Sequence, residues 1–285
     1  MTCTGALLPL PQPHDVPSPL TTDQVAAVVC GYKQGGTTFL SSLIAAAPGL
    51  ASRFECGLLQ ASTPAEIASI RPAVLENLVR SWKLPADGVA RLAGCSDFPQ
   101  VYRELVRQSG VLGGSVKLVD KFPDYTRCLR RVLDAYNGPI FFIARDPRAV
   151  FWSRQRRIYQ KDPGSWDGVR PIDAAHPSTR LSRMASEYRE IHRNITSAAN
   201  AFPERVHLFK LEEIVVHLHE QRSRLFGILG LAVPEQTFGD VGVPEQKVRH
   251  RLDDSVVDDY RKNLTSELQA EILDRCSAAS EFFFG

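Results

Sequence analysis

Four short runs along the chain are predominantly apolar, without the regular alternation of apolar and polar residues that marks a strand with one face in water. The runs cover residues 26–31, 116–119, 140–144 and 206–211. A short unalternated apolar run is typical of a strand buried on both faces. Helical stretches separate the runs, so the pattern predicts a parallel sheet with helices packed on both sides.

The segments between these runs have helical patterns, most clearly where apolar residues recur with amphipathic spacing. The predicted helices cover residues 37–47, 65–83, 147–159, 179–201, 223–231 and 254–279. Residues 1–23 contain five prolines, which restrict the backbone and prevent regular helix hydrogen bonding, so a flexible arm is expected there. We therefore predict a single α/β domain over residues 24–285, with three layers and a helical excursion.

Composition narrows the class of protein. The 285 residues include 34 Lys or Arg and 32 Asp or Glu, a formal net charge of +2, so no nucleic-acid partner is expected. An apolar fraction of 44% is a globular value. The six cysteines are too widely spread for a CxxC pair or a Cys/His metal cluster, and no apolar run approaches the roughly 20 residues of a membrane span. We expect a cytoplasmic protein with no metal site and no membrane span.

The first candidate site is the turn after the first predicted strand, which reads Gly31-Tyr32-Lys33-Gln34-Gly35-Gly36-Thr37-Thr38. Glycines at both ends of a four-residue gap are typical of a phosphate loop, whose backbone N–H groups converge on an anion at a helix N-terminus. Thr37 stands where a nucleoside triphosphatase has its lysine, and Lys33 lies inside the loop instead. This displacement argues against ordinary ATP or GTP hydrolysis. A glycine-rich turn without a ligand is the alternative.

The second candidate site follows the run at residues 140–144. Arg145 falls at the carboxyl end of a predicted parallel strand, the edge at which open α/β sheets bind ligands. Pro147 is well placed to begin a helix, and Ser153 lies about two turns into it. An arginine offers a planar fork to a phosphate and a serine adds a hydroxyl donor, so Arg145 and Ser153 form a second predicted phosphate site.

In this order and spacing the two motifs resemble the 5′-phosphosulfate loop and the 3′-phosphate motif of the sulfotransferase family that uses 3′-phosphoadenosine 5′-phosphosulfate (PAPS). The resemblance implies a P-loop sulfotransferase-like fold, PAPS as co-substrate and adenosine 3′,5′-bisphosphate (PAP) as product. The residues it assigns to the donor within these motifs are Lys33, Gly35, Gly36, Thr37, Thr38, Arg145 and Ser153.

A third segment, residues 120–125, follows the second predicted strand and resembles the Lys-x-Pro element of the same family. The resemblance implies that Lys121 approaches the bridging oxygen or the transferred sulfuryl group. Phe122 departs from the Ser, Thr or Asp of many members, and we expect it to make the acceptor side of the pocket more apolar. A surface loop with a proline turn is the alternative for this segment.

The general base is also implied by resemblance. Residues 47–57 are similar to the stretch that supplies a catalytic glutamate in the carbohydrate and tyrosyl-protein branches, which identifies Glu55. The cytosolic phenol branch uses a histidine just after Lys-x-Pro, and none lies between His14 and His176. Asp120 is the rival base, although alternating side-chain direction should turn it away from the face that presents Lys121. A surface carboxylate is the competing interpretation of Glu55.

Two segments nearer the C-terminus complete the resemblance. Glu212 and Glu213 match an acidic helix start and are expected to have no catalytic part. The basic stretch with Lys247, Arg249 and Arg251 resembles the loop that closes over the nucleotide, and is equally well explained as an exposed basic loop.

The resemblance implies transfer of a sulfuryl group from PAPS to a hydroxyl, less readily an amine, of a carbohydrate, small molecule or other acceptor, without a metal. The alternatives are a P-loop small-molecule kinase, which needs Mg²⁺ ligands and a lysine at position 37, and a non-catalytic nucleotide-binding module. The acceptor and the oligomeric state are unreadable from the sequence. Six aromatic side chains could line an acceptor pocket or a core, namely Phe54, Phe98, Tyr102, Trp152, Tyr159 and Trp166.

Overall fold

A computed structural model describes residues 21, 23–110, 112, 116–160, 177–235 and 255–277. Most of the expected N-terminal arm lies outside the described residues. The same holds for Trp166 and for three residues of the predicted nucleotide-closing loop, Lys247, Arg249 and Arg251. Their expected roles stay predictions.

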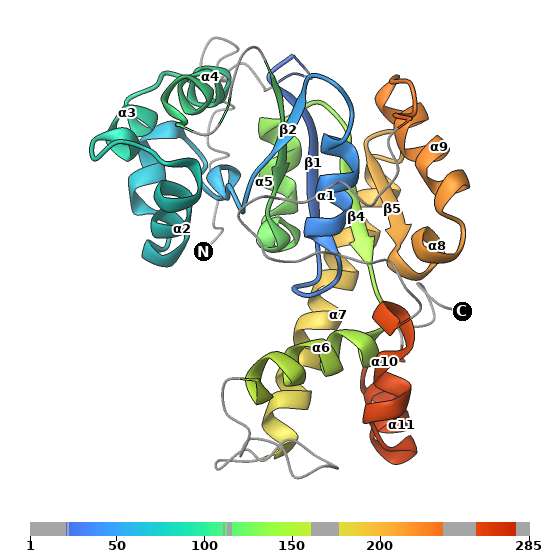
Figure 1. Ribbon diagram of the computed structural model, residues 1–285. Helices are drawn as coiled ribbons and strands as arrows, with labels where there is room; N and C mark the ends of the chain where they lie inside the picture. Colours follow the sequence, from blue (N-terminus) through green and yellow to red (C-terminus); the bar gives the residue numbers. More distant parts are fainter. Residues whose placement is uncertain are drawn as a thin grey trace, which may run out of the picture.

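Five parallel strands form the centre of the molecule (Figure 1). They are β1 (Val25–Gly31), β2 (Leu50–Ser52), β3 (Lys117–Lys121), β4 (Ile140–Ala144) and β5 (Val206–Lys210), in the order β2-β3-β1-β4-β5. Four of them are the predicted apolar runs, which confirms the parallel sheet. The fifth, β2, was not predicted because three half-buried residues are too few to show a period.

Helices cover both faces of the sheet (Figure 1). One face carries α1 (Thr37–Ala45), α8 (Leu211–Val216) and α9 (Leu218–Leu229), and the other carries α5 (Leu129–Ala135) and α7 (Pro177–Ala201). Alternate residues of β1 point to opposite faces of the sheet and pack in the cores on those two faces. Ala27 and Val29 belong to the core beside α1, whereas Val28 and Cys30 belong to the core beside α5 and α7. The predicted three-layer α/β architecture is therefore confirmed.

The predicted helical excursion lies between β2 and β3, beside the β2 edge of the sheet (Figure 1). It comprises η1 (Leu58–Gln60), η2 (Pro64–Ser69), α2 (Pro72–Trp82), α3 (Gly88–Ala93) and α4 (Phe98–Gln108). The prediction of one helix over 65–83 is wrong, because Ile70 and Arg71 leave the helical conformation ahead of Pro72. A proline disfavours the α conformation in the residue before it and has no N–H to continue a helix.

A further group of helices lies below the carboxyl edge of the sheet (Figure 1). It contains α6 (Pro147–Tyr159), α10 (Ser255–Asn263), α11 (Ser266–Arg275) and the first turns of α7. A single helix over 254–279 was predicted, but Thr265 caps a new helix there by accepting the N–H of Leu268 at 3.3 Å. The helix predicted from residue 223 begins earlier, at Leu218. None of the helices in the described ranges is both long and apolar enough to cross a membrane.

Candidate active site

The loop predicted to bind phosphate joins β1 to α1 at the carboxyl edge of the sheet. Position 31 requires glycine because the neighbouring strand β4 passes very close to it. A Cβ there would lie 2.5 Å from the carbonyl oxygen of Ile143. Gly36 begins α1 with φ 102°, a left-handed conformation that favours glycine. No side chain of the described residues caps this helix start. The first N–H groups of α1, together with the helix dipole, can therefore receive an anion.

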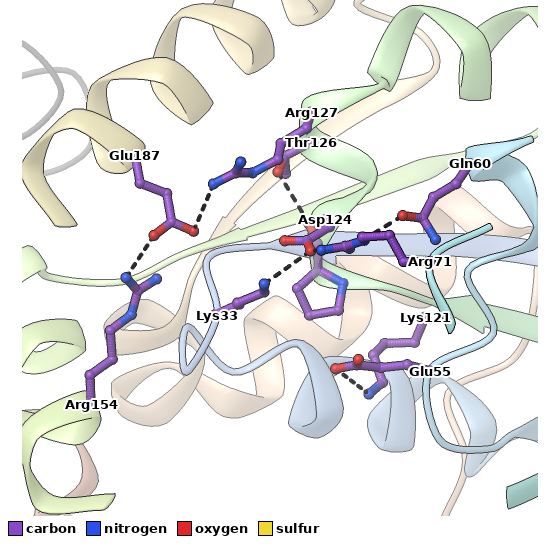
Figure 2. Close-up of polar contacts among 11 residues, drawn as sticks. Lys33, Glu55, Gln60, Arg71, Lys121, Asp124, Thr126, Arg127, Arg154 and Glu187 are labelled. Carbon is purple, nitrogen blue, oxygen red and sulfur yellow. Dashed lines mark hydrogen bonds and ion pairs between the residues drawn. The ribbon is translucent and has the colours of Figure 1, made fainter. Parts of the chain in front are cut away.

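Lys33 leaves this loop toward a carboxylate that the sequence analysis did not single out. Its Nζ lies 2.9 Å from Oδ2 of Asp124, and the same oxygen is 2.8 Å from an amino group of Arg71 (Figure 2). Asp124 belongs to η3 (Pro123–Arg127), directly after the Lys-x-Pro segment. Burial opposes its ionisation, but hydrogen bonds and charge from Arg71 and Lys33 outweigh this and hold the pKa of Asp124 below its usual value.

Arg145 lies at the end of β4 and reaches back to the phosphate loop. Its Nη1 donates to the carbonyl oxygen of Gln34 at 2.7 Å, which joins the predicted 3′-phosphate motif to the predicted 5′ loop. Burial lowers the pKa of Arg145, and nearby Glu212 opposes the effect. Glu212 lies in the first turn of α8, as expected, and also accepts the backbone N–H of Asp146 at 2.9 Å. The start of α6 is thereby fixed against α8.

Ser153 lies half-buried on α6, one residue from each of two anchored side chains. The indole N–H of Trp152 donates to Asp259 of α10 at 2.9 Å. Arg154 pairs with Glu187 of α7 at 2.8 Å, and Glu187 also pairs with Arg127 at 3.3 Å (Figure 2). The helix that carries Ser153 is therefore held from both sides, by α10 and by α7.

Glu55 and Lys121, which the sequence places far apart, form an ion pair. Oε1 of Glu55 lies 3.6 Å from Nζ of Lys121 (Figure 2), and the ammonium also lies 4.7 Å from the ring centroid of Phe54. The side chain of Lys121 is only 2% exposed. Burial lowers its pKa, and the charge of Glu55 opposes this. The backbone N–H of Cys56 donates to the carbonyl oxygen of Lys121 at 3.3 Å, so the loop that carries Glu55 is fastened to the end of β3.

Asp120 lies on the other face of β3 and is 1% exposed. Its Oδ2 accepts the hydroxyl of Tyr125 at 2.8 Å and the hydroxyl of Tyr102 of α4. Burial raises the pKa of Asp120 to about 6, against the effect of these two hydroxyls. A carboxylate so deeply buried is not accessible to an acceptor.

The aromatic candidates include residues of the core and one residue beside the Glu55–Lys121 pair. Phe98 and Tyr102 are buried in the core, whereas Phe54 lies against Lys121. Phe122 was expected on the acceptor side, but it is buried and packs edge-to-face on Tyr125 with ring centroids 5.2 Å apart. Among the described residues, no group of three or more His, Cys, Asp and Glu is arranged to hold a metal ion.

Comparisons with known proteins agree with this architecture. A family model described as the sulfotransferase family matches residues 27–235. No curated protein sequence matches the chain. Among solved structures, the sulfotransferase domain from the Synechococcus PCC 7002 olefin synthase is similar, with a TM-score of 0.60, 20% identity, and coverage of 96% of this chain and 98% of that one.

Two more structures have the same fold. The sulfotransferase domain from the curacin biosynthetic pathway has a TM-score of 0.59 and 22% identity, covering 91% of this chain and 99% of that one. Mouse sulfotransferase SULT7A1, complexed with PAP, has a TM-score of 0.53 and 12% identity, covering 94% and 87%. At these identities the likeness concerns the fold, and the predicted fold class is confirmed.

Proposed function

This chain belongs to the sulfotransferase family, and from that premise we propose that it transfers a sulfuryl group from PAPS to a hydroxyl of a carbohydrate or other small-molecule acceptor. Sulfuryl transfer follows from the family. PAPS as donor, the class of acceptor and the roles of the individual residues are the proposal. PAP bound to the similar mouse sulfotransferase supports PAPS as the donor.

The Glu55–Lys121 pair is the observation that carries the proposal. A carboxylate and a buried ammonium lie 3.6 Å apart at the carboxyl end of β3, the strand beside β1 and its phosphate loop. This edge is where an open parallel sheet binds its ligands. A base and a cation close together suit a reaction in which a hydroxyl loses its proton while negative charge grows on a leaving oxygen.

The donor side has groups that fit a nucleotide with phosphates at both its 5′ and 3′ positions. The loop from Gly35 to Thr38 and the uncapped start of α1 offer backbone donors, and Lys33 adds a positive charge that Asp124 holds in place. Arg145, hydrogen-bonded to the same loop, offers a guanidinium fork with Ser153 on the following helix. We assign the first group to the 5′-phosphosulfate and the second to the 3′-phosphate.

In the proposed reaction, Glu55 accepts the proton of the acceptor hydroxyl as its oxygen attacks sulfur. A new S–O bond forms while the bond between sulfur and the bridging oxygen of the 5′-phosphosulfate breaks. Lys121 and Lys33 offset the negative charge on the leaving phosphate and the sulfuryl oxygens, and PAP is released with the electron pair of the broken bond. Each of these charges is fixed or nearly fixed before reaction, which is the arrangement that stabilises a transition state.

The test is transfer from labelled PAPS to a panel of sugars, phenols, hydroxylated lipids and peptides. E55Q should lower turnover by about 10²- to 10⁴-fold, and K121M should lower it as well, while both variants bind PAP in calorimetric titrations. E76Q on the exposed face of α2, and K117M at the exposed amino end of β3, are matched controls and should behave as the parent.

Three outcomes would contradict the proposal. Phosphoryl transfer from ATP that requires Mg²⁺ would make the protein a kinase. PAP binding without transfer to any acceptor in the panel would favour a non-catalytic module. Parent-like turnover of both E55Q and K121M would remove the proposed base and its cation.

A further inference from the structure

Directly behind the Glu55–Lys121 pair, β3 carries a second carboxylate that the reaction above does not use. Asp120 is buried, and its Oδ2 accepts hydroxyls from Tyr102 of α4 and Tyr125 of η3. Its Oδ1 has no hydrogen-bond partner among the residues described. Burying a carboxylate with one oxygen unsatisfied costs stability, and an asparagine could accept the same two hydroxyls without a charge. Hydrogen bonding alone therefore does not require an acid at this position.

Asp120 and Lys121 lie on opposite faces of β3, but the strand does not screen the charge of one from the other. Val119 packs in the core beside α1, and alternation along β3 places Lys121 on the same side. Leu118 packs in the opposite core, and Asp120 shares that side with the two tyrosines. Because Asp120 and Lys121 are consecutive residues in a buried part of the sheet, their charges interact with little screening by water.

Lys121 faces a charge problem during the proposed reaction. The groups against its ammonium are the carboxylate of Glu55, the ring of Phe54 and, across the strand, Asp120. When Glu55 takes up the acceptor's proton it becomes neutral. Loss of that carboxylate charge lowers the pKa of the buried ammonium, and the charges left to oppose this are the anionic donor and Asp120. Of these two, only Asp120 is fixed in the protein and present at every stage of the reaction.

We propose that Asp120 is a positioning residue whose fixed negative charge keeps Lys121 cationic after Glu55 has been protonated. The inference rests on the proposed function, because it assumes that Glu55 is the base and that Lys121 serves the leaving group. Tyr102 and Tyr125 support this role, because hydrogen bonds from their hydroxyls favour the charged form of the Asp120 carboxylate. Tyr102 of α4, in the helical excursion, thus acts on Lys121 indirectly: its hydroxyl binds Asp120, and Asp120 keeps Lys121 charged.

Among the acidic groups buried around Asp120, only Asp120 is expected to be negatively charged. The titratable groups that face it are Tyr102, Tyr125, Cys56 and Lys121, and its charge also reaches the buried Tyr136. Burial, with the charge of Asp120 adding to it, raises the pKa of both tyrosines and of the Cys56 thiol, so these three stay neutral. With a pKa of about 6, Asp120 itself is mostly ionised at neutral pH.

The deciding experiment titrates Lys121 directly, in full-length protein saturated with PAP. E55Q imitates the neutral, protonated glutamate. The ammonium is followed by NMR of isotope-labelled lysine, with K121M used to assign its signal. The proposal expects the pKa of Lys121 to be lower in E55Q/D120N than in E55Q by about one unit or more. Identical titration of Lys121 in the two variants would overturn it.

Kinetics give a second, independent readout. In an otherwise unchanged chain, D120N should move the alkaline limb of the pH profile of kcat to lower pH, while its affinity for PAP stays within about twofold of the parent. D134N, on the exposed face of α5, is the matched control and should keep the parent profile. If D120N does not fold, Y125F replaces it, because loss of that hydroxyl weakens the charged form of Asp120 and should shift the same limb in the same direction.

Failure of this inference can be told from failure of the proposed function. Parent-like turnover of E55Q and K121M would refute the function itself. Loss of turnover in those two variants, with a parent-like alkaline limb in D120N and no change in the titration of Lys121, would refute only the role of Asp120.

Discussion

The ring of Tyr32 in the phosphate loop stacks on the ring of Tyr188 of α7, with centroids 4.0 Å apart and planes 3° from parallel. The hydroxyl of Tyr32 donates to the carbonyl oxygen of Tyr188 at 3.4 Å, and the hydroxyl of Tyr188 donates to the carbonyl oxygen of Arg145 at 2.9 Å. One side chain of α7 thus contacts both the loop assigned to the 5′-phosphosulfate and the strand end assigned to the 3′-phosphate. In addition to the direct hydrogen bond between Arg145 and Gln34, α7 therefore helps to fix the relative placement of the two halves of the proposed donor site.

Substitution of Tyr188 should therefore weaken PAP binding in two graded steps. Y188F removes the hydrogen bond to Arg145 and keeps the stacked ring, a loss of about 0.5–1.5 kcal/mol. Y188L also removes the stack, which adds about 0.5–1.5 kcal/mol beyond the change in buried area. Calorimetric titration with PAP measures both steps.

Tyr136 provides the matched control for this series. Its buried hydroxyl donates to the carbonyl oxygen of Val25 at 3.0 Å, at the amino end of β1 and away from the phosphate loop. Y136F should lower the free energy of unfolding without changing the affinity for PAP. Equal PAP affinity in Y188F, Y188L and the parent would contradict the positioning role of α7.

Arg145 should set the preference for nucleotides that carry a 3′-phosphate. R145A should reduce the preference for PAP over adenosine 5′-phosphate by about 10- to 100-fold, as expected for a charged hydrogen bond worth about 1.5–3 kcal/mol. R145K keeps the charge but not the planar fork, so it should recover only part of this preference. Competition binding measures the ratio, with R130A on the exposed face of α5 as control. An unchanged ratio in R145A would transfer the role to another cation, with Arg249 and Arg251 the candidates.

Removal of the carboxylate of Asp124 should strengthen nucleotide binding while it destabilises the fold. In D124N, Lys33 loses a competing anion 2.9 Å from its ammonium, and the site loses one negative charge. We expect tighter PAP binding, with a larger gain at low salt, where screening is weaker. D87N removes a carboxylate that pairs with Arg91 on the surface of α3, and should leave PAP affinity unchanged at every salt concentration.

The stability effect of D124N has a definite sign with pH. Because the folded-state pKa of Asp124 is below its usual value, its contribution to stability is present above the unfolded-state pKa of about 4 and is lost as pH falls through the lower folded-state value. Urea unfolding should therefore show D124N less stable than the parent at pH 7, with the difference shrinking in acid. A constant difference over this range would contradict the ion pairs with Lys33 and Arg71.

D120N should have the opposite pH dependence. The folded-state pKa of Asp120 is raised to about 6, so its contribution to stability is present below the unfolded-state pKa of about 4 and is lost as pH rises through 6. The free energy of unfolding of D120N, relative to the parent, should rise between pH 4 and pH 7.5 by an amount on the order of 3 kcal/mol. Urea unfolding at the two pH values measures it. Y102F, which removes a donor to the carboxylate, should instead destabilise more at pH 7.5 than at pH 4.

The sequence was sufficient to predict the elements that are determined by a short stretch of neighbouring residues. The apolar runs that became β1 and β4 are buried along their whole length, and β3 is buried after its first residue, so their lack of alternation could be read directly. The run that became the edge strand β5 is only partly buried. The phosphate loop was readable because glycine spacing and the change from strand to helix both lie within eight residues. Boundaries were less well predicted. Pro72 and Thr265 each begin a helix inside a segment that had been predicted as continuous, although both residue types are recognised helix starts.

The pairing of Glu55 with Lys121 needed the register of the sheet. Ser52 of β2 lies opposite Val119 of β3, so the chain that continues past each strand brings the two charged residues together. A three-residue strand gives no periodic signal, and resemblance to a family could name Glu55 without locating its partner. The sequence by itself therefore determined the candidate base, and the parallel pairing of β2 with β3 decided what it contacts.

For Asp120 and Asp124 too, the sequence indicated the residues, and only the tertiary structure showed what their carboxylates contact. Both are visible in the sequence around Lys121, and alternation correctly placed Asp120 away from the face of Lys121. Their partners could not be predicted. Arg71 and Tyr102 lie on the helical excursion, where one is an ordinary exposed cation and the other an ordinary aromatic residue of an amphipathic helix. Amphipathic spacing fixes which side of a helix is buried but not which strand it meets, so only tertiary packing decided that these side chains would serve the site.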